Sequence, residues 1–353
     1  MRDYRIAAIP GDGIGKEVIP AGLRVLEVLQ QRCGGFRLSV QCFPWGSDYY
    51  RAHGSMLPGD ALATLKAFDA IFFGAAGDPR IPDDVTLWGL RLHICQGFDQ
   101  YANVRPARLL PGIPSPLRGV EPGGLDWVIV RENTEGEYSG HGGRSHRGLP
   151  EEVATETSLF TRAGVARIMR FACQLARSRP RRRLTIVTKS NAQRHGMVLW
   201  DEIALETARD YPDLTVDRML VDAMAARMVT RPGSIDVAVA SNLHADILSD
   251  LAAALAGGMG IAPTANLNPE RRFPSMFEPI HGSAFDIMGR GIANPLGALW
   301  SAAMMLEHLG EPEAAARLMA GIEKVTAAGT ALTPDLGGRA TTDQAAAAVA
   351  DAL

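Results

Sequence analysis

The sequence of 353 residues predicts an α/β protein, either of two lobes or of one large unit. Short segments rich in β-branched residues, typical of buried strands, alternate with longer amphipathic segments typical of helices. This alternation is the pattern of a sheet covered by helices. The chain is also longer than the size at which a single hydrophobic core usually stops growing, which favours two lobes.

In the first half of the chain, each predicted strand is short, apolar and poor in charge, as in a sheet buried on both faces. The predicted strands are residues 5–9, 36–43, 68–75 and 126–132, and the predicted helices are residues 16–32 and 86–98. Residues 101–110 are expected to be extended, because prolines bracket their far end. The glycine-rich residues 140–148 are expected to form a flexible loop.

In the second half, the same alternation continues to the end of the chain. Strands are predicted at residues 184–191 and 235–240. The predicted helices with two stated ends are residues 158–179, 241 to about 255, 295–309 and 311–328. A further helix follows the strand 184–191 and ends at about residue 211, and two more begin at residues 221 and 341. Polar residues follow several strands, among them Arg131, Lys189 and Asn242. Because ligand sites of α/β proteins gather at strand ends, these residues are candidates for a site.

The glycine-rich turn at residues 10–15 follows the first strand and precedes a helix. After Gly11 and Gly13, a dinucleotide-binding fingerprint needs its third glycine at position 16, and this position is Lys16. The sequence therefore does not predict a Rossmann domain.

Composition excludes several classes of protein. Net charge is −3 at pH 7, which gives no electrostatic basis for binding nucleic acid or an anionic membrane. The basic run at residues 179–183 is read as a solvated turn. The four cysteines contain no C-x-x-C pair, and no segment is long and apolar enough for a signal peptide or a membrane span. These features predict a cytoplasmic protein.

Two aspartates in the helix after residue 240, Asp246 and Asp250, lie four residues apart and therefore share one face. Two unpaired anions so close repel each other, and a hard divalent cation with oxygen ligands would compensate. The alternative is two exposed aspartates with arginine or lysine partners. Spacing alone does not decide between them.

Segments spread in order over nearly the whole chain resemble the β-decarboxylating dehydrogenases, the family of isopropylmalate, isocitrate and D-malate/tartrate dehydrogenases. The matching segments are residues 9–15, 101–106, 131–138, 188–191, 221–223, 241–250, 278–286 and 292–295. Within the family, residues 87–89, 98–101 and 265–273 are most similar to D-malate/tartrate dehydrogenases.

The resemblance implies the two-lobe fold of isocitrate/isopropylmalate dehydrogenases, which is not a Rossmann fold and has a central sheet shared by both lobes. The large lobe is expected to be residues 1–100 plus 255–353, with the cofactor-binding loops. The small lobe is expected to be residues 101–254, with the metal and substrate residues and the dimer interface. A homodimer whose active sites draw on both chains is implied as well.

The resemblance also assigns roles to single residues. Asp246 and Asp250 are expected to hold Mg²⁺ or Mn²⁺ together with Asp222 of a second chain. Arg105 and Arg131 are expected to bind the carboxylates of the substrate, because a guanidinium pairs with a carboxylate in a bidentate manner. The expected acid–base pair is Tyr138 and, from the second chain, Lys189. The expected cofactor residues are His281, Gly282, Ser283, Ala284, Asp286 and Asn294.

The cofactor is predicted to be NAD. Asp286 is expected to accept hydrogen bonds from the ribose hydroxyls and to repel the 2′-phosphate of NADP. The predicted reaction is the NAD- and metal-dependent oxidative decarboxylation of a (2R)-2-hydroxy diacid, D-malate or tartrate. One alternative is 3-isopropylmalate or another malate substituted at C3, and another is a non-catalytic, ligand-binding regulatory homologue.

Two positions depart from the family pattern. The family usually has a substrate-binding arginine ten residues before Arg105, and this position is Cys95, which cannot replace a bidentate cation. Arg91 lies four residues before Cys95 and is expected to face the same way in a helix, so we expect it to take over carboxylate binding. His244 replaces a phenylalanine of the family and is expected to be packed.

Overall fold

The computed structural model describes all residues from 1 to 353 and divides into two compact units. Unit 1 comprises residues 1–100, 108–123 and 253–353, and unit 2 comprises residues 101–107 and 124–252. Residues 108–123, expected in the small lobe, therefore lie in unit 1. No helix has the length and apolar character needed to cross a membrane.

The strands of unit 1 are β1 (Arg2–Gly11), β2 (Phe36–Cys42), β3 (Ala70–Ala75), β11 (Pro263–Leu267) and β12 (Ser275–Pro279). The central strands, β3, β12 and β11, are buried, whereas β2 is largely exposed. The five strands lie in the order β2-β1-β3-β12-β11, and all pairs except the antiparallel β11–β12 are parallel. The carboxyl ends of β1, β3 and β12 therefore lie at one edge of the sheet.

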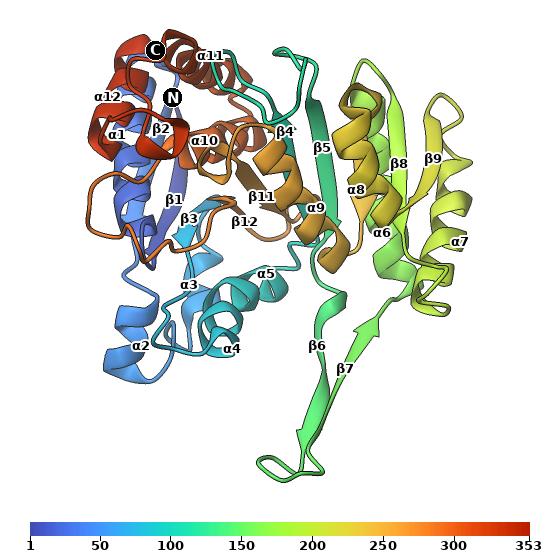
Figure 1. Ribbon diagram of the computed structural model, residues 1–353. Helices are drawn as coiled ribbons and strands as arrows, with labels where there is room; N and C mark the ends of the chain where they lie inside the picture. The colour runs from blue at the N-terminus through green and yellow to red at the C-terminus, as the bar shows by residue number, and fades with distance from the viewer. The chain divides into compact units, whose positions relative to one another are not determined.

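The helices of unit 1 pack on this sheet and on one another. They are α1 (Gly15–Cys33), α2 (Ser47–His53), α3 (Ala61–Leu65), α4 (Asp83–Thr86), α5 (His93–Gly97), α10 (Leu296–Leu309), α11 (Pro312–Ala328) and α12 (Thr342–Ala352). Helix α1 contacts β1 and β3, while α10 contacts β12 and β11. Helices α11 and α12, the last two helices of the chain, pack against each other (Figure 1).

The helix predicted at residues 86–98 is interrupted. Between α4 and α5, residues Leu87–Leu92 form a π-helix, whose hydrogen bonds run from residue i to i+5. The wider turn rotates successive side chains differently from an α-helix. Cys95 is 0% exposed within the apolar core of unit 1, whereas Arg91 is partly exposed.

Unit 2 has its own five strands, β4 (Ala102–Arg108), β5 (Asp126–Glu132), β8 (Arg183–Thr188), β9 (Thr215–Leu220) and β10 (Val237–Ala240). Their order is β4-β5-β10-β8-β9, and the pairs β5–β10, β10–β8 and β8–β9 are parallel. The helices are α6 (Arg162–Ser178), α7 (Gly196–Ala208), α8 (Val221–Thr230) and α9 (Asn242–Leu255). Short 3₁₀-helices occur at Pro232–Ser234 in unit 2, and at Met259–Ile261 and Pro334–Leu336 in unit 1.

The run at residues 179–183 is more than the expected solvated turn. Asp236 is buried at the start of β10, and its carboxylate accepts a hydrogen bond from Arg179 and lies 3.5 Å from Arg181. A buried carboxylate needs such partners, because an unpaired buried charge is costly. The basic run thus joins the end of α6 to the sheet.

A two-stranded antiparallel hairpin extends away from the sheet of unit 2 (Figure 1). It consists of β6 (Gly136–Ser145) and β7 (Val153–Leu159). The flexible loop predicted at residues 140–148 is therefore wrong in its first part, because residues 140–145 continue β6. Every residue of β7 is exposed.

His308, near the end of α10, is tightly packed in unit 1. Its ring lies 5.5 Å from that of Phe277, and burial, together with the nearby Arg271, lowers its pKa from 6.5 to about 4. Because the unfolded chain binds this proton at higher pH than the folded protein, acid favours unfolding. This contribution to stability is complete above pH 6.5 and is lost as the pH falls through the folded-state pKa of about 4.

We expect the free energy of unfolding to fall by up to about 3 kcal/mol through this residue over that range. The variant His308→Gln should lose this part of the pH dependence while keeping the rest. Urea unfolding of both proteins at several pH values between 7 and 4 measures the difference. Identical pH dependence in the two proteins would show that the pKa of His308 is the same in the folded and the unfolded chain, which would contradict this prediction.

Candidate functional site

Two arginines of unit 2 converge on one carboxylate. Arg131, the last residue but one of β5, is 2% exposed and donates a hydrogen bond of 2.9 Å to Oδ1 of Asp246. Nη2 of Arg105, on β4, lies 3.2 Å from the same oxygen atom. Since β4 and β5 are neighbours and α9 begins directly after β10, three elements bring these side chains together. The arrangement shows that both guanidinium groups are placed to bind a carboxylate at this point.

Hydrogen bonds within unit 2 fix the guanidinium of Arg105. Its Nε donates to Oδ1 of Asn103 at 2.8 Å, and its Nη1 donates to Oγ of Ser249 at 2.6 Å. Ser249 in turn donates to the carbonyl oxygen of Asp246. Because each bond constrains one edge of the planar group, the direction of the remaining edge towards Asp246 is set by the fold.

Tyr138, on β6, belongs to the same cluster. The guanidinium carbon of Arg131 lies 4.8 Å from the centre of the Tyr138 ring, a cation–π contact. Arg131 thus contacts both a predicted metal ligand and a predicted acid–base residue.

Asn242, the first residue of α9, orients the turn that leads to Tyr138. Its Oδ1 accepts from the backbone nitrogen of Glu137 at 3.1 Å, and its amide donates to the carbonyl oxygen of Glu135. Gly136 between them has a φ of 67°, and a Cβ there would lie 2.7 Å from Oδ1 of Asn242. From its place in the sequence, Asn242 was predicted only to be a polar residue at a strand end. The glycine at position 136 is the signal that could have indicated the positioning role of Asn242, because its positive φ and its closeness to Asn242 both require a residue without a Cβ.

Asp250 lies one turn after Asp246 on α9 and is exposed. The surrounding protein raises the pKa of Asp250 by desolvation, and the charge of Asp246 adds to this, while Arg105 and Arg131 oppose it. A carboxyl group with a raised pKa beside a second carboxylate gains from a cation between them. Within the chain, however, no three His, Cys, Asp or Glu side chains are placed to hold a metal ion together.

Lys189 and Asp222 form a separate pair in unit 2. Lys189 Nζ donates to Oδ1 of Asp222 at 2.7 Å, and this bond lowers the pKa of Asp222. The pair comes from the end of β8 and the first turn of α8, which are close because β8 and β9 are parallel neighbours. The Asp222 side chain is 66% exposed, so a second molecule could reach it. The predicted third metal ligand thus does not join Asp246 and Asp250 within one chain.

In unit 1, the residues predicted to bind the cofactor lie on the segment after β12 and pack against the turn after β1. The backbone nitrogen of Ile14 donates to the carbonyl oxygen of Ser283 at 2.8 Å. A Cβ on Gly13 would lie 1.8 Å from that oxygen, so only glycine permits this approach. The glycine-rich turn that fails as a dinucleotide fingerprint therefore supports the predicted cofactor segment.

The polar atoms of this segment suit a ligand. His281 Nε2 is buried without a hydrogen-bond partner, and burial lowers the pKa of His281, which keeps the ring neutral. Gly282 and Asp286 are exposed, Ser283 and Ala284 are partly buried, and Ala284 has a φ of 40°. Asn294 donates to Asp335 at 2.9 Å. An unpartnered buried ring nitrogen on this segment suits a ligand with a polar edge, such as a nucleotide.

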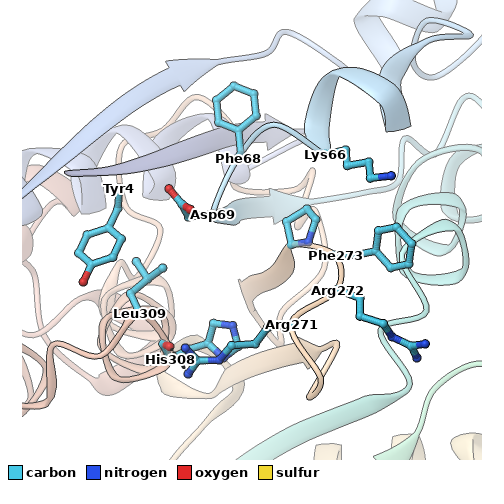
Figure 2. A pocket seen from close by; sticks show the side chains of 10 residues that line it. Tyr4, Lys66, Phe68, Asp69, Arg271, Arg272, Phe273, His308 and Leu309 are labelled. Carbon is cyan, nitrogen blue, oxygen red and sulfur yellow. Dashed lines mark hydrogen bonds between the residues drawn. The ribbon is translucent and has the colours of Figure 1, made fainter. Parts of the chain in front are cut away.

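A pocket of about 260 Å³ opens elsewhere in unit 1, where β1, β3 and β12 begin. Figure 2 shows Lys66 and Arg272 directed away from its centre, while Arg271 lies beside His308. Its cations therefore do not converge on a common point. It also lies at the strand ends opposite to the predicted cofactor segment, so we do not assign it to the substrate.

Comparisons with known proteins agree with this arrangement. The family model described as isocitrate/isopropylmalate dehydrogenase matches residues 5–352. A probable tartrate dehydrogenase/decarboxylase of Agrobacterium vitis is 69% identical over 353 residues, covering 100% of this chain and 98% of that protein. The decarboxylating D-malate dehydrogenase of Escherichia coli (strain K12) is 52% identical, with 99% of this chain and 98% of that protein covered.

Among solved structures, the isocitrate dehydrogenase of Methylococcus capsulatus superimposes with a TM-score of 0.88 and 36% identity, covering 99% of both chains. The fold predicted from the resemblance is thereby confirmed. From the full-length family match and these relatives, the chain belongs to the isocitrate/isopropylmalate dehydrogenase family.

Proposed function

We propose that the protein catalyses the NAD- and divalent-metal-dependent oxidative decarboxylation of D-malate or tartrate. The observation that carries this proposal is the convergence of Arg105 and Arg131 on the carboxylate of Asp246. Two fixed guanidinium groups beside a pair of aspartates suit a substrate with two carboxylates and a cation between substrate and protein. The names of the two relatives at 69% and 52% identity support this substrate class.

The cation would be held by Asp246 and Asp250, with Asp222 from a second copy of the chain. Mg²⁺ and Mn²⁺ suit this set, because all three ligands are hard carboxylate oxygens. Burial raises the pKa of Asp250, and the charge of Asp246 adds to this, so a cation at this carboxylate would stabilise its ionised form. Arg105 and Arg131 would then bind the carboxylates of the substrate.

When bound, the cation would make the substrate hydroxyl more acidic and stabilise negative charge on its oxygen, and NAD would supply the hydride acceptor. Lys189 of the second copy would accept the hydroxyl proton at Nζ, either directly or through one water. Tyr138 would donate its hydroxyl proton to C3. Arg131, in contact with the Tyr138 ring, would keep the tyrosine beside the bound carboxylate.

We propose that unit 1 binds NAD through His281, Gly282, Ser283, Ala284, Asp286 and Asn294. The neutral ring of His281, with its unpartnered Nε2, suits an adenine edge or face. Asp286 is exposed, so its carboxylate could accept from both ribose hydroxyls and would repel a 2′-phosphate. This charge is the reason for choosing NAD over NADP.

A homodimer with shared sites follows from the same assignments. The hairpin β6–β7 has exposed strands and carries the exposed apolar residues Leu149, Val153 and Leu159. An isolated two-stranded hairpin is only marginally stable in water, and its edges can pair with another chain. The carboxylate of Asp222, paired with Lys189, is 66% exposed and therefore accessible to a second copy of the chain.

The first prediction concerns substrate and cofactor. With Mn²⁺ and NAD, we expect D-malate or tartrate to give NADH absorbance at 340 nm (the usual assay wavelength) with kcat/KM about 100-fold above that for 3-isopropylmalate. NADP should give kcat/KM about 100-fold lower than NAD. Chelation of the metal should abolish turnover. Preference for 3-isopropylmalate would contradict the proposed substrate, and absence of turnover with every diacid would favour a non-catalytic regulatory subunit.

The second prediction concerns sharing of the site between chains. Lys189→Ala and Asp246→Asn should each lower kcat by about 10³-fold or more, since each removes a group acting on the substrate. Co-expression of the two variants should restore activity, because a mixed dimer with shared sites contains one intact site. The matched control is the pair Asp246→Asn and Asp250→Asn, which both lie in the same half-site and should restore nothing. Failure of the first pair in isolated mixed dimers would contradict shared sites.

A further inference from the structure

The carboxylate of Glu132 holds the turn between β5 and β6 in unit 2. Glu132 is the last residue of β5, directly after Arg131, and is 2% exposed. Its Oε2 accepts from the backbone nitrogen of Glu135 at 2.7 Å, and its Oε1 accepts from the hydroxyl of Thr134 at 2.8 Å. The backbone nitrogen of Thr134 lies 3.1 Å from both carboxylate oxygens. One buried carboxylate thus binds three donors of the turn.

Helix α6 holds the same turn through two further contacts. Nη2 of Arg167 donates to the hydroxyl of Thr134 at 2.8 Å. The carboxylate of Glu135 accepts from the backbone nitrogen and the hydroxyl of Thr161, the N-cap residue of α6, at 2.9 and 2.5 Å. A Cβ on Gly164 would lie 2.3 Å from the carboxyl carbon of Glu135, so a larger residue there would displace this carboxylate. The turn is therefore held both by β5 and by α6.

The shape of this turn determines where Tyr138 lies. Gly136, the first residue of β6, has a φ of 67°, a left-handed conformation that sets the direction in which β6 leaves the turn. Tyr138 comes two residues later, and its ring centre lies 4.8 Å from the guanidinium carbon of Arg131. Because Arg131 directly precedes Glu132, the turn that Glu132 holds is the only covalent path between the two partners of this contact.

Stability alone does not account for a buried carboxylate here. Burial raises the pKa of Glu132, while hydrogen bonds from Glu135 and Thr134 oppose this by stabilising the ionised form. Glutamate is rarely fully buried, and turns usually form with glycine or with short polar side chains at the surface. A carboxylate that fixes several backbone donors instead suits a turn whose following side chain must be held to within about 0.5 Å.

We propose that Glu132 is a positioning residue for Tyr138, and that its carboxylate holds residues 133–136 in the shape that places the tyrosine ring on Arg131. This inference rests on the proposed function, in which Tyr138 donates its proton to C3. Without the carboxylate, the turn would gain freedom and the tyrosine would leave its place. A displacement of about 1 Å at a reacting group lowers a rate by up to about 100-fold.

A double-mutant cycle with Tyr138→Phe tests the inference in the full-length enzyme. Glu132→Gln should lower kcat for the preferred diacid about tenfold and change KM less than about threefold, because the new amide nitrogen would face donors of the turn. Tyr138→Phe alone should lower kcat about 100-fold or more. If Glu132 acts through Tyr138, adding Glu132→Gln to Tyr138→Phe should lower kcat by less than about twofold.

Amide hydrogen exchange provides a readout that does not depend on activity. In the protein without ligands, the backbone N–H groups of Thr134 and Glu135 should exchange about tenfold faster or more in Glu132→Gln than in the unmodified chain. The matched control is Asp201→Asn, which removes a buried carboxylate bound to Arg218 in unit 2 and should change neither this exchange nor kcat. Thr134→Val removes one donor to Glu132 and provides a second cycle if Glu132→Gln folds poorly.

The outcomes separate this inference from the proposed function. An equal loss of kcat from Glu132→Gln with and without the Tyr138 hydroxyl would overturn the inference, as would unchanged exchange of the turn. Unchanged kcat in Tyr138→Phe would refute the role of Tyr138 and the inference with it. Absence of diacid turnover in the unmodified enzyme would instead refute the proposed function.

Discussion

The buried guanidinium of Arg131 is the constraint on which the site in unit 2 depends. A charge that is 2% exposed must be compensated, and Asp246 and the ring of Tyr138 provide this compensation. Arg131 lies on β5, Asp246 on α9 and Tyr138 on β6. The need to compensate the charge of Arg131 therefore links the position of α9 to the sheet. Asn242, the first residue of α9, adds a second link, because its side chain is hydrogen-bonded to the backbone of the turn before Tyr138. Removal of either interaction would leave buried polar groups unpaired.

This constraint also has a chemical consequence. Asp246 is bound by cations of the protein in a chain without ligands, and the same guanidinium groups are placed to bind a carboxylate. Under the proposed function, a divalent cation at Asp246 and Asp250 takes over the compensation of Asp246. Arg105 and Arg131 then become available to the carboxylates of the substrate.

Local patterns predicted much of the fold and part of the site. The strands at residues 126–132 and 235–240 are apolar and short, and the structure confirms both of them and places Arg131 beside Asp246. The resemblance supplied the roles of residues such as Lys189 and Tyr138, because a lone polar residue after a strand has many possible functions. The structure tests contacts rather than roles, so those roles stay predictions.

Other features could not be read from local patterns, for physical reasons. The π-helix at Leu87–Leu92 has the composition of an ordinary helix, since propensities do not distinguish i→i+5 from i→i+4 hydrogen bonds. The end of β6 is rich in glycine and looked like a loop, but it pairs with β7, a long-range contact that overrides weak local preference.

The central claim is that Asp246 exchanges its arginine partners for a divalent cation shared between two chains. A crystal structure of the protein with Mn²⁺, with data collected at the manganese absorption edge, measures this most directly. The account predicts an anomalous peak within about 2.3 Å of carboxylate oxygens of Asp246 and Asp250 of one chain and Asp222 of another. A structure in which manganese binds elsewhere while Asp246 still pairs with Arg131 would contradict it.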